Sequence, residues 1–280
     1  MQVFLNGQII KEEDAKISIS DLSYQFGYGL FETIKCEQGI PVFFESHYKR
    51  LTHSAKELDM PFPVEQEEFR NWIKSILGAN KLTQARVKII ISKRLEDKFN
   101  VFIMASSFEK LPSSYSLLSY TLSRDSKSVS FRHKTTSRAD SYVAYKKALE
   151  SGFNDALYVN EKNELIECTR ANIFLVLEDK IITPLLESGI LSGVTRTRVL
   201  EIAKNENITV EEKNVHSLYL SKAKGVFITN AIIGLMPVSR IKFEDKEYSF
   251  SVNSKITALK NSYDGEIQDY LRSVKSLVSP

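Results

Sequence analysis

The chain has 280 residues, of which 42% are apolar and 26% are charged, a composition typical of a folded globular protein rather than of a disordered one. Its 38 basic and 35 acidic residues are scattered and nearly balanced, which argues against a nucleic-acid-binding protein. No apolar run approaches the roughly 18 residues of a membrane-spanning helix, and the N-terminus lacks a basic region followed by an apolar run, so we expect a cytoplasmic protein.

The first part of the chain combines predicted strands with a predicted helix. Strand-like segments occur at 3–10, 85–94 and 99–108. The segment 47–60 has apolar residues at helical spacing. Near Pro112 the chain becomes polar and serine-rich, which indicates a domain boundary. We therefore expect a small α+β domain over 1–112 and a larger domain over 113–280.

The second part predicts a helix over 141–152 that ends at Gly152, followed by strands in 155–160, 165–169, 172–177 and 180–184. A further helix is expected to begin near Thr195, which is a candidate N-cap. The apolar segment 225–241 is expected to be interrupted at Gly234 and Pro237.

Several familiar chemistries have no motif in the sequence. There is no GxxxxGK[ST] loop, no GxGxxG after a strand and no GxSxG elbow. The histidines are too scattered to predict a zinc site. Cys36 and Cys168 have no metal-ligand spacing, so we expect two buried, inert thiols and no metal centre.

Six short motifs give a more specific prediction. They are GYGLFETIK at 27–35, HYKRLTHSAKEL at 47–58, HK at 133–134, LIECTRANIFLV at 165–176, GILSGVTRTRV at 189–199 and TNAIIGLMPV at 229–238. In this order and spacing the chain resembles the class IV aminotransferases, a family of pyridoxal 5′-phosphate enzymes that includes branched-chain and D-amino-acid aminotransferases and 4-amino-4-deoxychorismate lyase. The resemblance implies a fold type IV enzyme of mixed α+β and α/β structure, with two domains and the cofactor between them.

Such a cofactor requires a lysine for its aldehyde, a carboxylate for its pyridine nitrogen and donors for its phosphate. The resemblance identifies Lys134 as the catalytic lysine that binds the aldehyde. It implies that Glu167 pairs with the pyridine nitrogen, with Asn172 five residues further on. The alternatives are a solvated lysine and an exposed glutamate at a strand end.

The resemblance also implies a phosphate site. Arg50 matches the family's phosphate arginine, although a solvated position on the outer face of a helix is the alternative. Val194 and Thr195 match backbone amides that bind the phosphate at a helix N-terminus. Asn230 and Ala231 are further implied cofactor contacts.

Five residues are implied substrate contacts: Tyr28, Phe31, Lys88, Arg170 and Ile232. Tyr28 is expected near the pocket, with its side chain directed toward a partner subunit, because family members are homodimers. Arg170 is expected to bind the α-carboxylate of an amino acid through its guanidinium. A structural ion pair at the strand end is the alternative for Arg170.

The sequence therefore predicts transamination of an α-amino acid, of L or D configuration, with a 2-oxo acid such as 2-oxoglutarate as the acceptor. Aminodeoxychorismate lyase, which releases pyruvate and 4-aminobenzoate, is the alternative. Asn230, Lys88 and the spacing from Lys134 to Arg138 resemble the lyases, whereas RLEDKFN at 94–100 replaces their usual glycine-rich stretch. A decayed protein that only binds the cofactor or a partner is a third alternative, against which the intact Lys134, Glu167 and Arg50 argue.

Overall fold

A computed structural model describes residues 1–60, 62, 64–94, 98–108, 110–122 and 125–278, so the centre of the RLEDKFN stretch lies outside the described residues. Contacts divide the chain into two compact units. The first unit contains Met1–Lys110, His133–Arg138 and Ile267–Pro280, and the second contains Leu111–Arg132 and Ala139–Glu266. This division differs from a single cut after residue 112, because two later stretches pack with the first unit.

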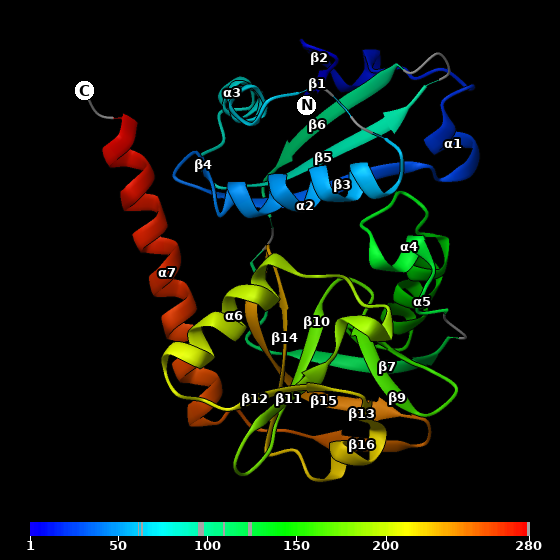
Figure 1. Cartoon of the computed structure of the whole chain (residues 1–280), viewed down its shortest axis with the longest axis vertical. Helices are drawn as coiled ribbons and strands as arrows, with labels where there is room; N and C mark the ends of the chain where they lie inside the picture. The colour runs from blue at the N-terminus through cyan, green and yellow to red at the C-terminus, as the bar shows by residue number, and fades with distance from the viewer. Residues whose placement is uncertain (61, 63, 95–97, 109, 123–124, 279–280) are drawn as a thin grey trace. The chain divides into compact units, whose positions relative to one another are not determined.

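The first unit is built on a six-stranded antiparallel sheet, in the order β2-β1-β6-β5-β3-β4 (Figure 1). Its strands are β1 Gln2–Leu5, β2 Gln8–Lys11, β3 Gly29–Glu37, β4 Ile40–Pro41, β5 Ala85–Lys93 and β6 Phe99–Ser106. Its other elements are the 3-10 turn Glu12–Asp14 and the helices α1 Leu22–Phe26, α2 Phe44–Glu57 and α3 Gln66–Ala79. The strands expected in 85–94 and 99–108 and the helix expected in 47–60 are confirmed. The segment 3–10 is a hairpin instead of one strand, because Asn6 and Gly7 turn the chain with positive φ angles of 49° and 91°.

One face of this sheet forms the core. Along β3, Leu30, Ile34 and Cys36 are buried, and they alternate with half-buried residues such as Phe31 and Thr33 on the other face. Helices α2 and α3 place their apolar stripes on the buried face, and Phe44, Leu51, Phe69, Ile73 and Ile76 join the same core cluster. The opposite face, called the open face below, is therefore left with partly exposed side chains.

The second unit contains a ten-stranded mixed sheet, in the order β12-β11-β10-β14-β15-β7-β8-β9-β13, with β16 paired to β15. Its strands are β7 Tyr115–Thr121, β8 Asp155–Val159, β9 Glu164–Cys168, β10 Asn172–Val176, β11 Ile181–Pro184, β12 Val210–Lys213, β13 Val215–His216, β14 Gly225–Asn230, β15 Gly234–Phe243 and β16 Lys246–Ser249. Its helices are α4 Val129–Arg132, α5 Ala139–Glu150 and α6 Val194–Asn205, with 3-10 turns at Leu186–Ser188 and Ser217–Ser221. Helix α7, Ser254–Val278, begins here, and its residues from Ile267 onward belong to the first unit.

The expected interruption of the segment 225–241 is only partly correct. The chain turns just before Gly234, where β14 ends and β15 begins. Pro237 does not break β15, because it lies opposite Phe227 of β14 inside the strand. The pairing of β15 with β7 starts only at Val238, so Pro237, which has no N–H, lies just before that ladder.

Both cysteines are buried, as expected. Burial raises the pKa of Cys36 to about 12 and also raises the pKa of Cys168, so neither thiol is a reactive thiolate at neutral pH. Among the described residues, no helix combines the length and the apolar character that a membrane crossing requires.

Candidate active site

Lys134 is fixed against strand β3 by main-chain pairing. The Phe31 N–H donates to the Lys134 carbonyl at 2.9 Å, and the Thr136 N–H donates to the Gly29 carbonyl at 2.9 Å. Gly29 permits this close approach, since a Cβ there would lie 2.9 Å from Thr136 Oγ1 and 2.7 Å from Ser23 Cβ. The second glycine of the GYG motif therefore provides the space that the lysine-bearing segment occupies.

The side chains of the neighbouring residues His133 and Lys134 point in different directions. His133 Nδ1 lies 3.0 Å from Ser54 Oγ of α2, whereas Lys134 Nζ lies 4.3 Å from the centroid of the Phe31 ring on the open face. The Lys134 side chain is half-buried. A primary amine held at a fixed position beside an aromatic ring is suited to form a covalent bond to an aldehyde.

Arg50 is held by a buried carboxylate. Its Nε donates to Glu32 Oε1 and its Nη2 donates to Glu32 Oε2, both at 2.7 Å. His47 Nδ1 lies 2.8 Å from the same Oε2, and Glu32 is only 1% exposed. The alternative of a solvated arginine on the outer face of α2 is therefore wrong. The pair uses only one edge of the guanidinium, and its role in phosphate binding stays a prediction.

The charges in this group follow from its burial and pairing. Burial by itself would raise the pKa of Glu32, but Arg50 and His47 outweigh it and hold that pKa well below the ordinary 4.5. Burial lowers the pKa of His47, with Glu32 acting in the opposite direction. Because an ionised carboxylate only accepts hydrogen bonds, His47 donates to Glu32 through Nδ1–H.

Tyr28 lies in a different environment from the one expected. Its hydroxyl donates to the Leu58 carbonyl of the same unit, and its ring packs against the core cluster of that unit. The side chain is thus tied to its own chain instead of reaching outward. Phe31 and Lys88, by contrast, are brought together with Lys134, since Lys88 Nζ lies 5.1 Å from the Phe31 ring centroid.

In the second unit, Glu167 and Asn172 share one hydrogen-bonded group. Glu167 lies in β9 and is 8% exposed. Its Oε2 accepts from the Leu191 N–H at 3.1 Å and lies 3.4 Å from Asn172 Nδ2, which also donates to the Leu191 carbonyl at 3.0 Å. The alternative of an exposed strand-end glutamate is wrong. The carboxylate is held beside the segment that leads into α6.

Helix α6 begins at the predicted phosphate residues. Gly193 is its N-cap and provides no side-chain hydrogen bond, and the first turn has no acidic residue. Thr195 is therefore not the N-cap, and its Oγ1 instead lies 3.3 Å from Tyr263 Oη. Because the first amides of a helix have no intrahelical acceptor and carry a positive partial charge, this end favours an anion beside Val194 and Thr195.

We expect Gly193→Ala to destabilise the protein by about 1–3 kcal/mol, because a Cβ at this position would lie 2.1 Å from Asn172 Oδ1. Asn172 would have to leave the group that it forms with Glu167. Urea unfolding at neutral pH measures the effect. Gly265→Ala in α7 is the matched control, since its Cβ meets nothing within 4 Å and it should not destabilise the protein. Equal stability of the two variants would contradict the packing argument.

The Arg170 guanidinium has several structural contacts in the second unit, among them a hydrogen bond of 3.3 Å from Nη2 to the Asn154 carbonyl. Its guanidinium carbon lies 3.8 Å from the Tyr145 ring centroid, and its Nε lies 3.7 Å from Asp155 Oδ2. Asp155 is 1% exposed, and burial raises its pKa despite the nearby arginine. The Arg170 side chain is 42% exposed. The structural ion pair that was the alternative for Arg170 is therefore present, with Asp155, but it is long. The Arg170 guanidinium is also partly accessible to solvent.

Asn230 organises the turn from β14 to β15. Its Nδ2 donates to the Arg170 carbonyl at 3.0 Å, and its Oδ1 accepts from the N–H groups of Ile232 and Ile233, each at 2.9 Å. Ala231 and Ile232 lie in this turn and are half-buried. Asn230 thus fixes the backbone of the turn and connects the turn to the backbone of Arg170.

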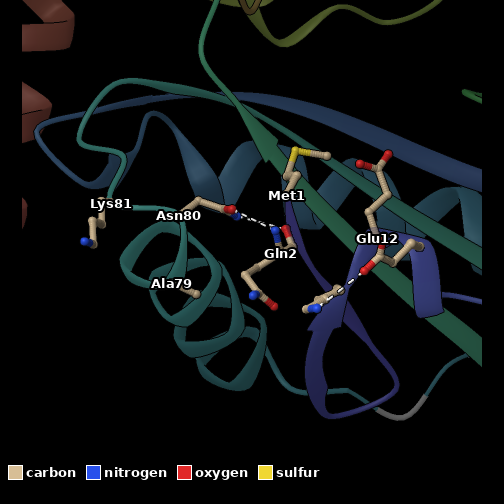
Figure 2. Close-up of a pocket in the computed structure, with 8 residues that line it drawn as sticks. Met1, Gln2, Glu12, Ala79, Asn80 and Lys81 are labelled. Carbon is tan, nitrogen blue, oxygen red and sulfur yellow. Dashed lines mark hydrogen bonds and ion pairs between the residues drawn. The ribbon is translucent and has the colours of Figure 1, made fainter.

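A surface cavity of about 500 Å³ occurs elsewhere in the first unit (Figure 2). It is lined by Met1, Gln2, Lys11, Glu12, Glu13, Ala79, Asn80 and Lys81. Figure 2 shows the side chain of Asn80 directed toward Gln2, with which it exchanges two hydrogen bonds of 2.9 Å. This cavity contains none of the sequence-predicted site residues.

Comparisons with known proteins show which family the chain is similar to. The model of the family described as amino-transferase class IV matches residues 29–241. The chain is 29% identical over 255 residues to a putative branched-chain-amino-acid aminotransferase of Methanocaldococcus jannaschii, covering 86% of this chain and 88% of the relative. It is 26% identical over 282 residues to an aminodeoxychorismate lyase of Bacillus subtilis, covering 96% of each.

The fold also matches that of a solved structure. The pyridoxal 5′-phosphate-bound form of a hypothetical aminotransferase from Mycobacterium tuberculosis matches with a TM-score of 0.84 at 17% identity, covering 95% of this chain and 99% of that chain. The family model covers well over half of the chain and includes Lys134, Glu167 and the N-terminus of α6. The chain belongs to the amino-transferase class IV family.

Proposed function

We propose that this protein is a pyridoxal 5′-phosphate-dependent aminotransferase that transfers an amino group from an α-amino acid to a 2-oxo acid such as 2-oxoglutarate. The observation that carries the proposal is Lys134, a half-buried lysine held on β3 by main-chain pairing in a chain of this family. Support also comes from the Mycobacterium tuberculosis protein of the same fold, whose structure is a form bound to this cofactor. We expect the protein to be cytoplasmic.

The remaining site residues have separate roles in this proposal. Glu167, oriented by Asn172, pairs with the pyridine nitrogen and favours its protonated form. Arg50 and the first amides of α6, at Val194 and Thr195, bind the phosphate. The turn formed by Asn230, Ala231 and Ile232 contributes cofactor and substrate contacts.

The bound cofactor supplies an electron sink for the charge that develops when Cα loses a proton. Lys134 Nζ would be the group that accepts and returns the proton of the substrate Cα. A half-buried position on the open face suits this task, since main-chain bonds fix the backbone that carries the Lys134 amine.

The lyase is the second candidate function. Lys88, which resembles a basic residue of the lyases, lies over the Phe31 ring beside Lys134, and the B. subtilis relative covers almost the whole chain. A single addition of D- or L-alanine without an oxo acid tests the choice. We expect one enantiomer to convert the visible absorbance of the bound cofactor to the shorter-wavelength amine form. No conversion by either, together with pyruvate release from aminodeoxychorismate, would favour the lyase.

We propose that Arg170 binds the α-carboxylate of the amino acid. Arg170→Ala should raise KM for small amino acids about tenfold, because a charge-assisted hydrogen bond is lost. Arg170→Lys keeps the charge and should recover part of the affinity. Unchanged KM values together with lower unfolding stability would assign Arg170 to a structural role with Asp155 and Tyr145.

We propose a homodimer that uses an exposed apolar surface in the first unit. Ile19, Tyr24 and Phe26 are 80%, 69% and 71% exposed, and Gln25 Nε2 donates to the Ile19 carbonyl, which joins the loop to α1. Sedimentation of Ile19→Asp should show a shift from dimer to monomer. Leu218→Asp, a 69% exposed position in the second unit, is the control that should stay dimeric. A wild-type monomer would contradict the proposal.

A further inference from the structure

Tyr263 of α7 is a buried tyrosine that lies outside the six sequence motifs and beyond residue 241, where the match to the family model ends. Its side chain is 2% exposed. Along the helix it follows Ile256 and Leu259 at spacings of three and four residues, and these two side chains are 1% and 0% exposed. The three residues form one buried stripe of α7, in which Tyr263 is the member with a hydroxyl group.

Two glycines of the second unit make room for this stripe. A Cβ on Gly225, at the start of β14, would lie 2.9 Å from Ile256 Cδ1, and a Cβ on Gly234, at the start of β15, would lie 3.1 Å from Tyr263 Cε1. Gly234 also has a φ angle of 61°, at which a side chain would add strain. The Tyr263 ring therefore lies directly against the end of the turn that Asn230 organises.

The hydroxyl of the same side chain reaches the start of α6. Tyr263 Oη lies 3.3 Å from Thr195 Oγ1, and Thr195 is 2% exposed in the first turn of that helix. Asn172, which also hydrogen-bonds to Glu167, packs against the N-cap Gly193. The start of α6 thus contacts the group of Glu167 and Asn172 through Gly193, and it contacts α7 through Thr195.

Hydrogen-bond capacity gives this contact a chemical meaning. An unprotonated phosphate only accepts hydrogen bonds, whereas a threonine hydroxyl has one proton to donate and two lone pairs. When Tyr263 donates to Thr195 Oγ1, the threonine proton remains available to an anion at the start of the helix. Because both side chains are 2% exposed, bulk water has little access to replace the tyrosine hydroxyl.

We infer that Tyr263 is a positioning residue for the phosphate end of the cofactor, an inference that rests on the proposed function. Its hydroxyl orients Thr195, and its ring supports the turn that contains Asn230 and Ala231. In the proposed function both of these segments contact the cofactor. Tyr263 acts on cofactor binding through them, from a helix that the motifs do not include.

Tyr263→Phe tests the inference, because it keeps the ring against Gly234 and removes only the hydroxyl. The full-length apo-protein is titrated with pyridoxal 5′-phosphate and with pyridoxal, which lacks the phosphate, and binding is followed by absorbance. The Kd for pyridoxal 5′-phosphate should rise about fivefold, since one buried hydrogen bond is lost. The Kd for pyridoxal should not change. A purely structural role would weaken the binding of both aldehydes alike.

A double-mutant cycle identifies the partner of the hydroxyl. Thr195→Val removes the group that Tyr263 Oη contacts and keeps the main-chain amide. In that background Tyr263→Phe should cause no further rise in the Kd for pyridoxal 5′-phosphate. Tyr270→Phe is the matched control, because it removes a hydroxyl from the same helix that donates to Glu45 Oε2 in the first unit. It should keep the wild-type ratio of the two dissociation constants.

An unchanged Kd for pyridoxal 5′-phosphate in Tyr263→Phe, or an equal rise for both aldehydes, would overturn the inference. An undiminished effect in the Thr195→Val background would also overturn it, because the hydroxyl would then act elsewhere. The two proposals can fail separately. A wild type that binds the cofactor but transfers no amino group refutes the proposed reaction, and the ratio still decides the role of Tyr263. A wild type that binds neither aldehyde refutes both proposals.

Discussion

Lys134→Ala is expected to abolish the visible absorbance of the covalently bound cofactor and to lower turnover by roughly 10³-fold or more. The substitution removes both the amine that binds the aldehyde and the group that moves the proton at Cα. The fold should persist, because the segment is attached to β3 by main-chain bonds that alanine keeps. Absorbance spectra and initial rates of the reconstituted variant measure the two effects.

The matched control for this variant is Lys49→Ala. Lys49 is an exposed residue of α2, next to Arg50 in the sequence. Its replacement by alanine removes one positive charge from the first unit, as Lys134→Ala does. Its spectrum and turnover should equal those of the wild type. A Lys134→Ala variant with wild-type turnover would show that another group performs the chemistry.

Glu32→Gln is expected to destabilise the protein by about 3–5 kcal/mol and to weaken cofactor binding. The variant keeps the shape of the side chain but leaves the Arg50 guanidinium without its buried counter-charge. Arg50 would keep at most one of its two hydrogen bonds, to the amide oxygen, so we also expect weaker binding of the phosphate. Urea unfolding and titration of the apo-protein with pyridoxal 5′-phosphate measure these effects.

The effect of Glu32 should depend on pH. Its pKa is lower in the folded protein than the ordinary 4.5, so its contribution to stability is complete well above pH 4.5 and is lost as the pH falls through the acid range. The stability difference between the wild type and Glu32→Gln should therefore shrink below pH 4.5. Glu37→Gln, on the same strand and paired with Lys35, should cost at most about 1 kcal/mol. A cost for Glu32→Gln no larger than this would contradict the assigned pairing.

The order of the motifs identified the family, but it did not reveal how the side chains are supported. Glu32 lies in β3, a strand whose buried residues alternate with half-buried ones, and Leu30 and Ile34, two residues to either side, are buried. This position in the alternation was the sequence feature that could have predicted a buried carboxylate. His47 and Arg50 are three residues apart on α2 and therefore share a helix face. Their meeting with Glu32 depends on how α2 packs on β3, which sequence spacing does not specify.

Local patterns predicted elements better than boundaries. Helix α3 has Phe69, Ile73 and Ile76 at helical spacing, so its signal was present although we made no prediction there. Thr195 was a reasonable N-cap by residue type, but Gly193 is the N-cap, and Asn172 packs directly against it. The pairing of Lys134 with β3 joins residues about a hundred positions apart, and only the tertiary structure reveals it.

The central claim, that Lys134 binds pyridoxal 5′-phosphate covalently, has a direct test. The reconstituted protein is reduced with borohydride, digested and analysed by peptide mass spectrometry. We predict a phosphopyridoxyl group on the peptide that contains Lys134, and its absence from the same peptide of the Lys134→Ala variant. Labelling of another lysine instead, or no labelled peptide from a protein that is folded and saturated with the cofactor, would contradict the account.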